Sequence, residues 1–417
     1  REGSHPGYLL GGARLERFES WTPSTAIGLT DSERGFIERS IEARDAQVEA
    51  EAERRQREVS VLRRASVRVW AFATVAMAGV VAVTLVLLGV FAPAGQKIGV
   101  IYLGAGDQGQ NDLLVLGVDE AERRYGVEAA VIAPLADPHE DLARLCESDH
   151  KLVLVVSSFF LPLADSGPEC ADTLIVGIDW PPPEAIPQVD RPNVVQAVFG
   201  IEEGSFLAGA AAALASQTKH VAFVGAMPIV PVERARAAFT AGAASIDPGI
   251  TVESIYVGET EASGFFNPER GKAAAQQAIE AGADVVFNDA AGSGPGLLEA
   301  VREASQSTGL KHWFIGSEAD DYLAASEIDR QYVLTSVVKR TDRVLLDVVA
   351  DYLDGSLEPG PRFYGLATHG IELSEGGGFL DDYRDRLAEL EDAVISGQIN
   401  VPTVPLRPVT LPTPSDD

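Results

Sequence analysis

Residues 104–109 (GAGDQG) have the spacing of a dinucleotide-binding loop. They follow an apolar run at 98–103, and in such loops the glycines let the backbone approach a pyrophosphate at the start of a helix. The same fingerprint requires an acidic residue at the end of the next strand, where residues 129–134 (AAVIAP) supply none. An NAD-dependent enzyme is therefore the disfavoured alternative for this segment.

Other patterns of catalytic or metal-binding residues are incomplete. Residues 292–296 (GSGPG) lack the lysine of a phosphate-binding loop, and the chain contains neither a G-x-S-x-G nor an H-E-x-x-H motif. The six histidines lie too far apart in the sequence to suggest a metal site. We therefore expect a protein that is not an enzyme and that uses no cofactor and no metal.

The two cysteines, Cys146 and Cys170, flank an apolar run at 152–156. Both follow the membrane segment described next, on the side where disulfides persist. A disulfide between them is one expectation and two free thiols are the other, because the sequence does not give their separation.

An uncharged stretch at residues 69–92 is long enough to cross a bilayer, which takes about 20 apolar residues. Six arginines at 54–68 precede it and Lys97 follows it, so the positive-inside rule places the N-terminus in the cytoplasm and residues 93–417 outside. A cleaved signal peptide would be shorter and would lie at the chain start. A buried core helix is the other alternative. We expect a single-pass protein of the plasma membrane.

Charge is distributed unevenly about this stretch. Arginines and acidic residues balance in residues 1–68, so the whole net charge of −29 falls on the predicted outer part. Such an acidic surface repels nucleic acid and anionic lipid. We expect no nucleic-acid partner for this segment, and contact with the membrane through residues 69–92.

The residues before the span predict the end of a signalling region and a linker. Residues 7–15 (GYLLGGARL), followed by Trp21, resemble the stretch that closes the helical region of bacterial STAND-type signalling ATPases. Thr30 and Glu33 have the spacing of a capping box at the start of a helix over 30–68. That helix either transmits motion into the membrane or is a solvated spacer. The first interpretation implies an upstream signalling domain as a partner.

Beyond the span, short apolar runs alternate with amphipathic helical segments. Such runs indicate parallel strands that are covered by helices on both faces. The predicted strands are at 98–103, 129–133, 152–156, 174–178, 194–198, 221–224, 252–256, 285–287, 313–315 and 333–336. Two such series predict two α/β lobes. Ligands of open parallel sheets bind at the carboxyl ends of the strands, so the cleft between the lobes is the expected site.

Several segments resemble, in the same order, the basic membrane protein (BMP) family, the PnrA-like purine nucleoside-binding proteins of bacterial ABC transporters. The segments are 107–112 (DQGQND), 193–199 (NVVQAVF), 203–209 (EGSFLAG), 223–227 (FVGAM), 265–268 (FFNP), 291–294 (AGSG), 315–320 (IGSEAD) and 333–340 (VLTSVVKR). The resemblance implies a type I periplasmic-binding-protein fold, hinge closure on a small ligand, and no catalysis.

The resemblance also implies which residues bind the ligand. A purine has two π faces and a polar edge, and a ribose diol suits a carboxylate and an ammonium. The implied residues are Asp107 and Asn111 at the base edge, Gln110, Ser158 and Phe159 nearby, Phe265 stacking from the second lobe, Gly225 for close backbone approach, Gly292, and Glu318 with Lys339 at the sugar. Each has a structural alternative as a helix cap, a core aromatic or a surface ion pair.

The chain departs from the family pattern at three positions. Gln110 stands where an aromatic ring is usual, Gly109 where serine is usual, and Glu318 where an aspartate would bind the sugar. Losing one stacking ring removes about 1 kcal/mol. We therefore expect a nucleoside-like or sugar-like small molecule as the ligand.

The predicted fold class is α/β, a two-lobed type I periplasmic-binding-protein fold behind a long helix and one transmembrane helix. The expected boundaries are a signalling remnant at 1–29, a charged linker helix at 30–68, the membrane helix at 69–92, lobe 1 at 97–217 and 333–360, lobe 2 at 218–332 and 361–400, and a disordered proline-rich tail at 401–417. Because solute delivery needs no cytoplasmic part, we expect the sensor of a larger signalling protein. The alternative is the substrate-binding component of a BMP/PnrA-type ABC transporter, and an enzyme is the third possibility.

Overall fold

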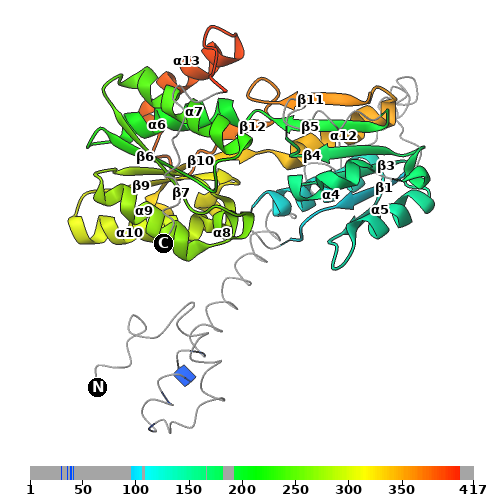
Figure 1. The fold of residues 1–417 in the computed structure, drawn as a ribbon, viewed down its shortest axis with the longest axis horizontal. Helices are drawn as coiled ribbons and strands as arrows, with labels where there is room; N and C mark the ends of the chain where they lie inside the picture. The colour runs from blue at the N-terminus through cyan, green and yellow to red at the C-terminus, as the bar shows by residue number, and fades with distance from the viewer. Residues whose placement is uncertain are drawn as a thin grey trace, which may run out of the picture. The chain divides into compact units, whose positions relative to one another are not determined.

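The chain after residue 91 is organised around two β-sheets (Figure 1). The structure is a computed structural model that describes residues 30, 35, 38, 39, 41, 95–105, 109–165, 167–181 and 192–403. Residues 1–91 and 92–417 form separate compact units, and the second is described here. None of the described helices has the length and apolarity needed to cross a membrane. The predicted remnant at 1–29, the span at 69–92 and most of the 30–68 linker and the 401–417 tail lie outside the described residues.

The first sheet has the strand order β11-β5-β4-β3-β1-β2, and all neighbours in it are parallel. Its strands are β1 (Lys97–Ile101), β2 (Glu128–Ile132), β3 (Leu152–Val156), β4 (Leu174–Ile178), β5 (Val194–Phe199) and β11 (Gly360–Tyr364). The central strand β3 (LVLVV) is buried at every position, as expected for a parallel strand covered on both faces.

The second sheet has the order β12-β10-β9-β8-β6-β7. Its strands are β6 (His220–Gly225), β7 (Thr251–Tyr256), β8 (Val285–Asp289), β9 (Trp313–Glu318), β10 (Val333–Lys339) and β12 (Ile371–Leu373). Its pairs are parallel except for β12, which runs antiparallel to β10 at the edge. Two parallel-rich sheets in one chain confirm the predicted two-lobed α/β fold.

Helices surround both sheets. The α-helices are α4 (Gln110–Tyr125), α5 (Pro138–Glu147), α6 (Ile201–Ala215), α7 (Val230–Ile246), α8 (Glu261–Phe265), α9 (Pro268–Glu280), α10 (Gly294–Thr308), α11 (Asp321–Ala324), α12 (Thr341–Asp354) and α13 (Arg384–Ile395). Short 3-10 turns are η2 (Ser158–Asp165), η3 (Pro168–Cys170), η4 (Ala291–Ser293), η5 (Arg330–Tyr332) and η6 (Asp381–Tyr383). We call the first sheet with α4, α5 and α12 lobe 1, and the second sheet with the remaining helices lobe 2.

The lobe boundaries differ from those expected. Strand β10 (Val333–Lys339) belongs to the second sheet, and α6 packs on α7 and β10 of lobe 2, although both elements were assigned to lobe 1. Within residues 192–403 the chain passes between the sheets after β5, after β10 and after β11. Hydrogen bonds join these crossings: the Gly200 amide donates to Tyr364 O at 3.0 Å, and the Arg340 amide to Gly370 O at 2.9 Å.

Helices α6 and α7 approach so closely that only glycine fits at the contact. A Cβ on Gly209 would lie 2.0 Å from the Phe239 carbonyl oxygen, and one on Gly242 would lie 1.9 Å from the Phe206 carbonyl oxygen. Both contacts are with backbone, which cannot turn away as a side chain can. This contact therefore fixes the spacing of the two helices in lobe 2.

Cys146 and Cys170 form a disulfide in lobe 1, with their Cα atoms 5.1 Å apart. The bond joins α5 to η3, and both cysteines are buried in the small core that also holds Trp180. It closes a loop over 24 positions of sequence separation.

Removing this disulfide should lower the free energy of unfolding. The double variant Cys146→Ala/Cys170→Ala should lose about 3 kcal/mol, because a loop of this length loses that much chain entropy when it is cross-linked in the unfolded state. Urea unfolding of the oxidised wild type and of the variant measures the difference. A change below about 1 kcal/mol would show that the bond contributes little to lobe 1.

Candidate ligand-binding site

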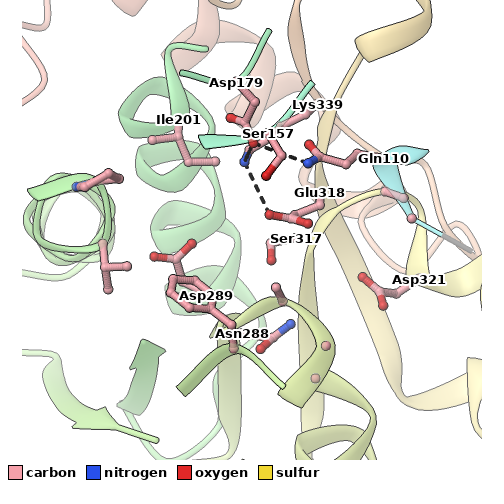
Figure 2. A pocket seen from close by; sticks show the side chains of 18 of the residues that line it. Gln110, Ser157, Asp179, Ile201, Asn288, Asp289, Ser317, Glu318, Asp321 and Lys339 are labelled. Carbon is pink, nitrogen blue, oxygen red and sulfur yellow. Dashed lines mark hydrogen bonds and ion pairs between the residues drawn. The ribbon is translucent and has the colours of Figure 1, made fainter. Parts of the chain in front are cut away.

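A cavity of about 890 Å³ lies between the two sheets, at the carboxyl ends of their strands. Lobe 1 contributes residues that follow β1, β3 and β4, and lobe 2 contributes residues at the ends of β8, β9 and β10. Figure 2 shows the polar side chains that the two lobes bring together there. The volume is that of a pocket for a small organic molecule, which is typically about 300–1,000 Å³.

Lys339, the last residue of β10, is at the centre of a polar cluster (Figure 2). Its Nζ donates to Asp179 Oδ2 at 2.9 Å and to Glu318 Oε1 at 3.3 Å, and Gln110 Nε2 also donates to Asp179 Oδ2 at 3.3 Å. Burial alone would lower the pKa of Lys339, but the carboxylates of Asp179 and Glu318 outweigh burial and raise this pKa above its ordinary value. The amine is therefore charged at neutral pH and links the two lobes.

Four residues in the cavity wall have a left-handed backbone at the ends of strands. They are Ser157 (φ 96°) after β3, Asp179 (φ 62°) after β4, Ala291 (φ 43°) just after β8, and Glu318 (φ 76°) at the end of β9. Residues other than glycine seldom adopt this conformation, which costs about 1–3 kcal/mol and concentrates at ligand sites. The strain at these four positions marks the cavity as a site that the fold holds in a defined geometry.

Asp289 and Asp321, two further carboxyl groups in the cavity wall, have raised pKa values. Burial raises the pKa of Asp289 to about 7; the nearby Lys339 opposes this rise, and the charges of Glu318 and Asp179 add to it. Burial likewise raises the pKa of Asp321 to about 7, although the hydroxyl of Ser336 donates to its Oδ2 at 3.3 Å. Both acids therefore change charge near neutral pH.

Protein stability should depend on pH through Asp321. Its pKa is 3.8 as an unperturbed group and about 7 in the fold, so the unfolded chain loses the proton first as pH rises. The stabilising contribution is complete below pH 3.8 and is lost as pH rises towards 7. The free energy of unfolding of Asp321→Asn should therefore rise relative to that of the wild type as pH increases through this window. The change should be up to about 1.4 kcal/mol per pH unit. Urea unfolding at several pH values checks this, and a pH-independent difference would contradict it.

Aromatic rings from both lobes also meet at the cavity. Phe159 of lobe 1 and Phe266 of lobe 2 have ring centroids 5.8 Å apart, and both are exposed. Phe265 and the buried Trp180 lie in the same wall, and Trp180 Nε1 has no hydrogen-bond partner among the described residues. The rings of Phe159, Phe265 and Phe266 offer stacking surfaces.

The structure brings most of the site residues expected from the sequence to this cavity. Those in its wall are Gln110, Asn111, Ser158, Phe159, Phe265, Gly292, Glu318 and Lys339. Asp107 lies outside the described residues. Gly225 is not in the wall, because it is buried at the end of β6, where a Cβ would meet Val232 Cγ1 at 2.6 Å and Phe223 at 2.8 Å. Packing inside lobe 2, and not the approach of a ligand, explains this glycine.

Sequence reasoning missed several wall residues. Ser157 and Asp179 directly follow predicted strands, and Asp289 ends β8 two residues after the predicted strand. A polar residue just past an apolar run was therefore the available signal, because carboxyl ends of parallel strands face the ligand. Phe266 gave no such signal: the sequence does not reveal which of two adjacent phenylalanines faces Phe159.

Two parallel-rich sheets, repeated crossings between them and a polar cavity at their facing strand ends define a two-lobed solute-binding protein. Residues 184–404 match the model of the family described as "ABC transporter substrate-binding protein PnrA-like", and the chain belongs to this family. The family is one of substrate-binding proteins, which are not enzymes. The match includes Lys339 and Asp289 but begins after Asn111 and Asp179, so it covers lobe 2 and only the later parts of lobe 1.

Curated relatives agree with this assignment. The "ABC transporter nucleoside-binding protein BmpA" of Lactococcus lactis subsp. cremoris is 30% identical over 222 residues, which are 51% of this chain and 62% of that protein. "Basic membrane protein A2" of Borrelia garinii subsp. bavariensis is 25% identical over 316 residues, 73% of this chain and 88% of that protein. The chain spans about three fifths of the length of the curated relatives it matches first.

Solved structures share the fold. ABC transporter solute-binding proteins from Aeropyrum pernix K1 superpose with a TM-score of 0.59 at 23% identity, over 74% of this chain and 94% of theirs. A transcriptional activator of the comK gene from Bacillus halodurans gives 0.61 at 18% identity, over 73% of this chain and 99% of its own. At these identities the similarity shows the periplasmic-binding-like fold alone.

Proposed function

We propose that the chain binds a nucleoside-like solute between its lobes, as the substrate-binding component of an ABC transporter. The observation that carries the proposal is the Lys339 cluster, in which one charged amine lies between carboxylates of both lobes inside the cavity. An ammonium donates to a ribose hydroxyl and a carboxylate accepts from its neighbour. The Lactococcus relative, whose name says that it binds nucleosides, supports the same ligand class.

The rest of the wall suits the base of such a ligand. Phe159 and Phe265 present aromatic surface from opposite lobes, and Asn111 and Gln110 add amide groups that recognise a polar edge. Binding to both walls at once would stabilise the closed arrangement of the lobes, since a ligand shifts a conformational equilibrium only through contacts that differ between its states.

Titration calorimetry of the purified full-length chain tests the ligand class. Adenosine, guanosine and inosine should each be compared with free ribose and with glucose. We expect at least one nucleoside to bind with one site per chain and more tightly than either sugar, because only a nucleoside fills both the Lys339 cluster and the aromatic wall. Absence of heat with every nucleoside would reject the proposal.

The family match favours delivery of a solute to a transporter over the sensor suggested by the residues before the span. The sensor remains a second candidate because the sequence places a charged helical stretch at 30–68 directly before the apolar stretch at 69–92. A sensor requires that binding to residues 93–417 change the activity of a cytoplasmic domain. Loss of solute uptake without a signalling defect after gene deletion would reject the sensor.

We also propose that residues 69–92 anchor the protein in the plasma membrane, with the N-terminus in the cytoplasm and residues 93–417 outside. The arginines at 54–68 and the uncharged run after them support this orientation. Protease added to intact spheroplasts should remove an epitope placed after residue 403 and leave an N-terminal epitope intact. The reverse pattern would reject the orientation.

A further inference from the structure

Asp289 lies at the end of β8, in the wall of the cavity. No residue that the structure describes donates a hydrogen bond to its carboxyl group or forms an ion pair with it. Its backbone does take part in the fold, since its carbonyl oxygen accepts from the Ala226 amide at 3.0 Å. A carboxyl group that is partly removed from water and lacks donors costs free energy. Folding therefore does not explain the side chain at this position.

The other carboxyl groups near Asp289 have donors. Lys339 donates to Asp179 and to Glu318, and Asp321 accepts hydrogen bonds from a serine hydroxyl and a backbone amide. In Figure 2 Asp289 and Asp321 lie on opposite sides of Glu318, and the dashed lines do not reach Asp289. Lys339 already donates to two carboxylates, and no other described residue donates to Asp289.

A second group in the same wall also lacks a donor. Gln110 is only 5% exposed, and its Nε2 donates to Asp179 Oδ2. Because a carboxylate accepts and cannot donate, this bond assigns the amide orientation and leaves Oε1 as an acceptor. No described residue donates to Gln110 Oε1. Gln110 Oε1 in lobe 1 and the Asp289 carboxyl group in lobe 2 are thus two acceptors without a donor among the described residues.

We propose that the ligand carries a protonated amine and that Asp289 pairs with it. The proposal rests on the proposed function and narrows its ligand to nucleoside-like or sugar-like molecules in which an amino group replaces a hydroxyl. An ammonium has three donors and no acceptor, which matches the carboxylate of Asp289. A hydrogen bond to a charged group in such a wall increases affinity by about 10- to 100-fold.

Matched ligand pairs test this inference. Adenosine should be compared with its 5′-amino and 3′-amino derivatives, and glucose with glucosamine, by calorimetric titration of the full-length chain near neutral pH. We expect at least one amine to bind about 10-fold or more tightly than its hydroxyl parent. In Asp289→Asn this ratio should fall to about one, because the amide removes the charge and retains the shape. Glu280→Gln, which removes the same charge from an exposed site on α9 of lobe 2, should keep the ratio.

The outcomes separate this inference from the proposed function. If adenosine binds at least as tightly as every amine, the cavity takes nucleosides but the pairing with Asp289 is rejected. A preference for amines that survives in Asp289→Asn rejects the role of Asp289. If no member of any pair binds, both the nucleoside-like ligand and the amine are rejected together.

Discussion

Replacing Lys339 with methionine should reduce nucleoside affinity by at least about 100-fold and lower the free energy of unfolding by about 3 kcal/mol. Methionine keeps the length of the side chain but removes the amine that donates to Asp179 and Glu318. Two carboxylates then remain close together in a wall where burial already disfavours charge, which is the costly way to break a buried ion pair. A bound nucleoside also loses the donor that the Lys339 ammonium would provide to its ribose hydroxyl groups.

Calorimetry and urea unfolding measure the two effects separately. Lys272→Met is the matched control, because Lys272 pairs with Glu299 and Glu303 outside the Lys339 cluster, at carboxylates that are 46% and 44% exposed. Such exposed pairs contribute about 0–1 kcal/mol, so the control should retain binding and most of its stability. Full binding by Lys339→Met would remove the basis of the proposed sugar site.

Gly242→Val should destabilise the protein by more than about 3 kcal/mol. The first added carbon would lie 1.9 Å from the Phe206 carbonyl oxygen, and the branches of valine need still more room. Relief requires α6 and α7 to separate, which opens the packing of lobe 2, and overpacking of this kind typically costs about 1–3 kcal/mol even when the clash is milder.

Ala244→Val on the same helix is the control for the lower helix propensity of valine. Ala244 is exposed, so this substitution should cost less than about 1 kcal/mol. Equal unfolding midpoints for the two variants would show that the α6–α7 contact has room that the fold does not reveal.

The ten strands from β1 to β10 could be predicted, most of them from a short apolar run; β7 (TVESIY) is an exception, because Glu253 and Ser254 interrupt its apolar residues. Strands β11 and β12 could not be predicted. The sequence of β11 (GPRFY) contains glycine, proline and arginine, which an edge strand tolerates because one of its sides forms no ladder. Strand β12 (IEL) has three residues, too few to show a period.

Lobe membership was harder to predict than strand position. An apolar run such as that of β10 indicates that a strand is buried between helices, but not to which sheet the strand belongs. The position of β10 and α6 in lobe 2 therefore could not be predicted from the order of elements along the chain. The expected boundaries after residues 217, 332 and 360 each miss a crossing, after β5, β10 and β11, by one element. Tertiary pairing, which brings β10 beside β9 and β11 beside β5, decides the boundaries.

Some residues of the site could likewise be predicted from the sequence, and others could not. Glu318 and Lys339 could be named because they stand in recognisable segments, and the structure places them 3.3 Å apart. Asp179 and Asp289 could not be named with them, since the convergence of strand ends from two sheets is a property of the folded chain. Gly225 was wrongly included in the predicted site. It stands in a segment that resembles the family, but its lack of a side chain allows close packing within lobe 2.

Hydrogen–deuterium exchange of the full-length chain, with and without saturating adenosine, tests most directly whether the ligand lies between the lobes. We expect slower exchange at both walls of the cavity, around Ser157 to Phe160 in lobe 1 and around Ala290 to Gly294 in lobe 2, as well as at the crossing after Lys339. Protection confined to one lobe, or protection only at surfaces away from the cavity, would contradict the account.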